Sequence, residues 1–111
     1  MSERREELLA ALEAVYRRGS VWGEPSRADD GSVRVSDSGG VTWIGLAVMP
    51  EDLEDPAFAD RLRDFASQRM PNDGRLCPFE VLPSEDCRAK VEALLCDLRL
   101  DERVSVYSLA A

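Results

Sequence analysis

The sequence predicts an α/β domain: a small mixed four-stranded sheet with helices packed on it, in the order α-β-β-α-β-α-β. One observation is the stretch 41–49, the longest nearly uncharged apolar run in the chain. A run that is apolar on both faces indicates a strand covered on both sides. Another is that two strand–helix units follow in series before a last strand, which favours parallel pairing. An antiparallel α+β sandwich, with the helices on one face only, is the alternative.

The first half of the chain predicts a helix and a β-hairpin. In 2–18, apolar residues recur at helical spacing, and Gly19 ends the pattern. The alternating segment 32–36 and the apolar run are joined by a short glycine-containing connection, which is typical of a hairpin. Between the helix and the hairpin, 19–32 is rich in turn residues. We expect its Trp22 to fold back on the core, with a ligand-facing role as the alternative.

The second half predicts two strand–helix units and a closing strand. A helix is expected from Pro56 to about residue 70, with Asp55 as its cap. A strand is expected at 76–82, and Pro78 within it suggests an edge position or a bulge. The next helix is expected to start after Ser84 and to end near residue 99. An alternating strand over 103–109 closes the chain.

Size and composition predict one globular domain, 1–111, in a chain of 111 residues with 44% hydrophobic and 32% charged residues. The 22 acidic against 14 basic residues give a formal charge of −8. Nucleic acid phosphates and anionic lipid surfaces would repel such a chain, so we expect no direct nucleic acid binding, no membrane association and a basic protein partner. The N-terminus lacks the apolar core of a signal peptide, so a cytoplasmic location is expected.

The catalytic inventory is poor. There is no histidine, which removes the commonest general base and the usual zinc ligand. The odd set Cys77, Cys87 and Cys96 has no CxxC spacing, so reduced, partly buried thiols are expected. Cys87 falls in the first turn of a helix, where a thiol pKa is lowered. It also falls on the apolar stripe, which favours a role in core packing.

Acidic residues follow the ends of the two predicted inner strands, where ligand sites of open α/β sheets lie. They are Glu51, Asp52, Glu54, Asp55, Glu85 and Asp86. Converging carboxylates bind Mg²⁺ or Ca²⁺. Acids also favour the first turn of any helix, because the backbone dipole stabilises negative charge there. We therefore expect no metal and no other cofactor.

Two functions of different classes follow. The first is a non-catalytic acidic module that docks on a basic partner surface, of the inhibitor, immunity, anti-defence or chaperone type. Its predicted partner-binding residues are the six acids above and Trp22. The alternative is a small enzyme or a ligand-binding regulatory domain that uses the loops 50–55 and 83–86. The lack of catalytic groups favours the first, and the sequence does not decide the oligomeric state.

Overall fold

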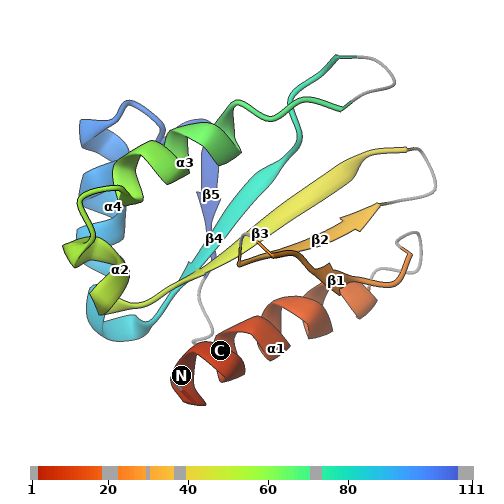
Figure 1. Ribbon diagram of the computed structural model, residues 1–111, viewed down its shortest axis with the longest axis horizontal. Coiled ribbons are helices and arrows are strands. Elements are labelled where there is room, and N and C mark those ends of the chain that lie inside the picture. Colours follow the sequence, from red (N-terminus) through yellow and green to blue (C-terminus); the bar gives the residue numbers. More distant parts are fainter. Residues whose placement is uncertain (1–2, 19–22, 30, 37–39, 71–73, 108–111) are drawn as a thin grey trace.

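The computed structural model describes residues 3–18, 23–29, 31–36, 40–70 and 74–107 (Figure 1). The helices are α1 (Glu3–Arg18), α2 (Pro50–Glu54), α3 (Phe58–Ala66), the 3₁₀-helix η1 (Glu85–Cys87) and α4 (Arg88–Asp97). The strands are β1 (Ser26–Arg27), β2 (Ser32–Ser36), β3 (Thr42–Val48), β4 (Phe79–Pro83) and β5 (Val104–Val106). Among these residues, no helix is both long and apolar enough to cross a membrane.

The sheet is mixed, as predicted, and its strand order is β1-β2-β3-β4-β5. The pairs β1–β2 and β2–β3 are antiparallel, whereas β3–β4 and β4–β5 are parallel. The class and the central place of the apolar run are therefore confirmed. The prediction of four strands is wrong, because β1 adds a fifth strand with only two paired residues. So short a strand produces no alternating pattern in the sequence.

Helices cover both faces of the sheet (Figure 1). On one face, α1 buries Leu12 and Tyr16 against β2 and β3. On the other, α3 and α4 enclose a larger apolar cluster in which Phe65 and Phe79 stack with ring centroids 5.4 Å apart. The central strand β3 faces both layers, with Ile44 in the larger cluster. This two-sided cover rules out the alternative sandwich with helices on a single face.

Proline marks two further departures from the prediction. Pro50, expected in a loop, begins the short helix α2, as proline favours a first helical position. Pro78 suggested an edge strand or a bulge, and the edge position is wrong because β4 lies between β3 and β5. Pro78 precedes β4, and only its carbonyl oxygen is used, accepting the Ile44 N–H at 2.9 Å. Its missing N–H therefore costs the ladder nothing.

Both later helices are shorter than predicted. The helix expected from Pro56 starts at Phe58 and ends at Ala66. Beyond it, the carbonyl oxygen of Gln68 accepts the N–H of Cys77 at 2.9 Å, so this backbone turns towards β4 instead of continuing the helix. The last helix begins with the 3₁₀ turn η1 and ends at Asp97, close to Arg99, whose φ of 58° is left-handed.

Candidate functional site

The acidic loops after β3 and β4 leave the sheet side by side. In the parallel register, Val48 is the partner of Pro83. The Ser84 N–H then donates to the Val48 carbonyl oxygen at 2.9 Å, which ties the start of one loop to the end of the neighbouring strand. The fold thus brings 50–55 and 83–86 to one end of the molecule, as the sequence analysis expected of parallel strands.

Two adjacent arginines of α1 reach these loops. Arg4 binds Asp86 with both terminal nitrogens, each 3.2 Å from a carboxylate oxygen. Arg5 lies 2.9 Å from an oxygen of Asp52 and 3.3 Å from one of Glu51. The start of α1 therefore contacts both loops. Three of the six predicted partner-binding acids, Glu51, Asp52 and Asp86, are already paired with an arginine of α1.

The same acids also order the backbone of the loops. The second carboxylate oxygen of Asp52 accepts the Met49 N–H at 2.8 Å, which satisfies an N–H at the start of α2. Asp55 accepts the Ala57 N–H at 2.9 Å in the turn before α3. The prediction that Asp55 caps this helix is wrong, because the N-cap of α3 is Ala57. Ser84 precedes η1, and its hydroxyl donates to Asp86 instead of capping the backbone.

These contacts set the electrostatics of the strand ends. The Ser84 hydroxyl, and then the Arg4 guanidinium, hold the pKa of Asp86 below its usual value. The hydrogen bond to Asp52 raises the pKa of Arg5. These contacts favour the charged forms of Asp86 and Arg5. In chemical terms, much of this end of the molecule is a set of internal salt bridges and caps.

The remaining predicted acids lie at the surface. Glu54 and Asp55 are exposed, and so is Glu85. Of these three, Glu85 lines a cavity of about 130 Å³, together with Arg4, Glu7, Leu8, Pro83 and Ser84. In the described part of the chain, no group of three or more cysteine, aspartate or glutamate side chains is placed to hold a metal ion. Trp22, the seventh predicted residue, lies outside the described residues.

The thiols are placed largely as expected. Cys87 is 1% exposed, and its sulfur lies 3.2 Å from the Ser84 hydroxyl oxygen within the larger core cluster. Cys77 is buried too, and burial raises the pKa of its thiol. Cys96 is exposed. Cys87 therefore takes the packing role, and the reactive position among the three is Cys96 by exposure alone.

One polar cluster was missed by the sequence analysis. Glu80 in the middle of β4 is 6% exposed, and the Tyr16 hydroxyl donates to it at 3.1 Å. Burial, and then the Glu80 carboxylate, raise the pKa of both Tyr16 and Tyr107. Gly45 makes room for the cluster, because a Cβ there would lie 2.6 Å from the Tyr16 hydroxyl oxygen. The one sequence feature that indicates this cluster is Glu80, a single acid inside an otherwise apolar strand.

The sequence also contains a feature that points to the arginine contacts. Arg4 and Arg5 stand in the first turn of α1, where the helix dipole disfavours positive charge. Such a pair indicates acidic partners elsewhere in the fold. The sequence does not show which acids these arginines bind, because the partner can be far along the chain: Asp86 is 82 positions from Arg4.

Comparison with known proteins adds no relative to this description: no family model, no curated protein and no solved structure matches the chain. The candidate site is therefore defined by its own contacts, as an acidic strand-end surface braced by two arginines of α1.

Proposed function

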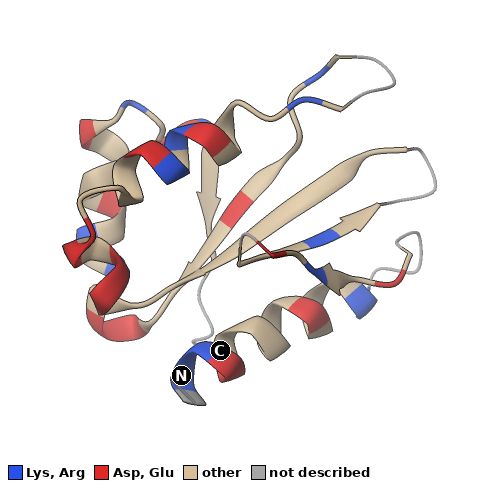
Figure 2. Ribbon diagram, in the orientation of Figure 1, with Lys and Arg blue, Asp and Glu red and all other residues tan. Residues whose placement is uncertain are grey.

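We propose that the chain is a non-catalytic protein-binding module that docks on a basic surface of a partner protein, in the manner of an inhibitor, immunity, anti-defence or chaperone protein. The observation that carries the proposal is the placement of charge. Residues 50–66, which include α2 and α3, contain six acidic and two basic side chains. In Figure 2, acidic positions recur along α2, α3 and η1.

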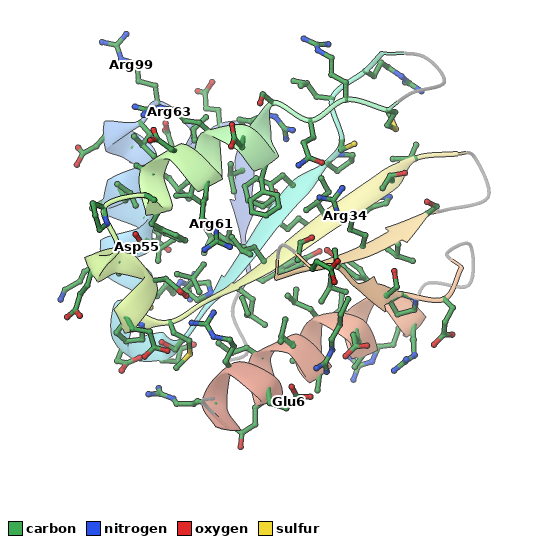
Figure 3. The ribbon with its side chains drawn as sticks, viewed as in Figure 1. Glu6, Arg34, Asp55, Arg61, Arg63 and Arg99 are labelled. Atoms are coloured by element: carbon green, nitrogen blue, oxygen red, sulfur yellow. The ribbon has the colours of Figure 1, made fainter. Side chains whose placement is uncertain are left out.

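The predicted partner-binding residues divide into two groups in this proposal. Glu51, Asp52 and Asp86 are bound by α1 and brace the strand-end surface. Glu54 lies exposed at the end of α2. Asp55 is exposed on the connection to α3 (Figure 3). These two would meet a partner's arginines or lysines directly, with Glu85 on the neighbouring loop.

Electrostatics would act mainly on the rate of encounter. A surface with one sign of charge steers an oppositely charged partner and raises the association rate. Exposed charges are screened over roughly 8 to 10 Å at physiological ionic strength. Binding by this surface should therefore slow steeply as salt rises.

The alternative, a small enzyme or ligand-binding regulatory domain, stays a prediction. Its loops at 50–55 and 83–86 do lie together. However, the carboxylates of Asp52 and Asp86 are directed to arginines and to groups of their own loops. They do not converge on a common ligand position, so the geometry favours the binding module.

Affinity capture from the native host lysate tests the proposal. The immobilised chain is compared with Glu54→Lys/Asp55→Lys and with a control, Glu24→Lys/Asp29→Lys, which makes the same change of net charge. Both control positions are exposed and lie between α1 and β2. The proposal expects a partner that is lost at high salt and by the first variant, and kept by the control. A partner retained equally by both variants would contradict it.

A further inference from the structure

A second surface, separate from the strand-end acids, lies between α4 and the outermost strand β5. It is a groove with a volume of about 420 Å³. Its lining residues are Glu92, Leu95, Cys96, Asp101, Glu102, Val104, Ser105 and Val106. The groove therefore runs along a sheet edge and has a helix as its other wall.

The edge of β5 presents backbone hydrogen-bonding groups to this groove. β5 ends the strand order of the described residues. The Tyr107 N–H donates inward to the Val81 carbonyl oxygen at 2.8 Å. Because backbone groups alternate in direction along a strand, those of Val104 and Val106 point away from β4. The Val104 N–H donates to the Leu100 carbonyl oxygen at 2.9 Å. The backbone groups that remain along the edge are the Val104 carbonyl and the N–H and carbonyl of Val106.

The groove combines an apolar floor with an acidic rim. Leu95 and Val104 are buried in the larger core cluster, and Val106 packs against it while remaining partly exposed. Asp101 and Glu102 are exposed beside them. Glu92 on α4 has Arg88 at 3.0 Å, so Asp101 and Glu102 supply most of the rim's negative charge.

We propose that this groove binds an extended basic segment of a partner protein, which adds to the sheet as a further strand beside β5. The segment's backbone would bond to Val106 and to the Val104 carbonyl, while alternate apolar side chains would rest on Leu95 and Val106. Its lysines or arginines would meet Asp101 and Glu102. The inference rests on the proposed protein-binding function but uses a different surface, which is tested by different variants.

Charge complementarity selects this occupant over a second copy of the chain. Two copies paired edge to edge along β5 would bring their acidic rims together, and each chain carries a net charge of −8. Like charges placed opposite one another destabilise strand pairing. A basic strand instead neutralises the rim as it pairs, so the edge and the rim favour the same partner.

The test uses a phage-displayed library of random twelve-residue peptides, selected on the full chain. Peptides that alternate apolar residues with lysine or arginine are expected. Two readouts place them: a bound peptide should slow alkylation of the exposed Cys96 in the groove, and it should protect the Val106 amide from hydrogen exchange. The Ser105 amide, which points towards β4, serves as the internal control.

Two variants separate edge pairing from rim charge. Val106→Pro removes an outward N–H, which an edge strand tolerates, and should weaken binding by about threefold to tenfold; Val106→Ala, which shortens the same side chain of the floor and keeps the N–H, is its control and should weaken binding less. Asp101→Asn/Glu102→Gln should weaken binding of the basic peptides by about fivefold. The control Glu24→Gln/Asp29→Asn makes the same charge change elsewhere and should leave binding unaltered. Glu54→Lys/Asp55→Lys should also spare it, so this inference and the strand-end proposal can fail independently.

Four results would overturn the inference. They are selected peptides without basic alternation, unchanged alkylation of Cys96 on binding, a Val106 amide already protected in the unbound chain, and a concentration-dependent dimer abolished by Val106→Pro. The last would assign the edge to a second copy of the chain.

Discussion

The two helical layers of the sheet hold their charges differently. The α1 layer is balanced, with four acidic and four basic side chains in 3–18. Arg4, Arg5 and Arg17 of α1 bind carboxylates outside the helix, as Arg17 does with Glu24 at 2.8 Å. The opposite layer is not balanced: 50–66 has six acids and two bases, and 84–102 has six acids and three bases. The excess charge is therefore directional, which is what a docking surface requires.

The apolar clusters beneath the two helical layers also differ in their polar content and size. Beneath α1, the apolar contacts surround the buried Glu80 and its bond from Tyr16. Beneath α3 and α4, the apolar cluster contains the larger number of side chains, and the hydroxyl of the buried Ser84 contacts its Cys87. The acidic layer is thus held by apolar packing from below, so carboxylates such as Glu54 can vary without loosening the fold.

The largest effect is expected in the apolar core. Ile44→Ala should lower the free energy of unfolding by about 2 to 5 kcal/mol, because Ile44 is fully buried and the change leaves a cavity. Trp43→Ala should cost less, since Trp43 is partly exposed on the α1 side. Denaturant unfolding measures both. If neither variant changes the unfolding midpoint, β3 is not the centre of the core.

A substitution that adds volume tests how closely α1 packs against β3. Gly45→Ala should cost about 1 to 3 kcal/mol, because the new Cβ meets the buried Tyr16 hydroxyl. In the Tyr16→Phe background the same change should cost less, since the hydroxyl is gone. A double-mutant cycle by denaturant unfolding measures the coupling. Equal costs in the two backgrounds would show that α1 does not approach Gly45 this closely.

Alkaline pH should probe the same layer. Burial, and then the charge of Glu80, raise the pKa of Tyr16, so the folded state keeps a proton that the unfolded chain loses above about pH 10. Stability is full below that pH and should fall as the pH rises, by up to about 1.4 kcal/mol per pH unit for this group. Tyr16→Phe should make the decline between pH 9 and pH 11 shallower. An identical slope in both proteins would contradict the assignment.

The smallest effects are expected at the arginines that brace the strand ends. Arg5→Ala should cost about 1 kcal/mol and Arg4→Ala less, because solvent screens the more exposed of the two ion pairs more strongly. The order follows from exposure: the Asp52 side chain bound by Arg5 is 15% exposed, whereas Asp86 bound by Arg4 is 52% exposed. Thermal unfolding at low and high salt measures the difference. A larger loss for Arg4→Ala would reverse this ranking.

How far the sequence predicts this molecule depends on how local each signal is. The composition of the 41–49 run is local, and it correctly gave β3 its central place. The two-residue strand β1 and the ion pair between Arg4 and Asp86 depend on chain segments that meet only in the folded state. The sequence predicts that the acids lie beyond the carboxyl ends of the inner strands, where β3 and β4 end. It does not distinguish the acids that bind arginines of α1 from the other acids of these loops.

The most direct test of the account is the rate at which a captured partner associates with the chain. Wild type, Glu54→Lys/Asp55→Lys and Glu24→Lys/Asp29→Lys are compared across a salt series, and Asp52 is left intact because it orders the start of α2. The unfolding midpoint of each variant is measured as well, because Asp55 accepts the Ala57 N–H and Glu24 is bound by Arg17. The account predicts that association slows with salt and that only the first variant slows it at low salt. Equal rates for the two variants, or a chain that captures no protein, would contradict the claim that the acidic layer is a docking surface.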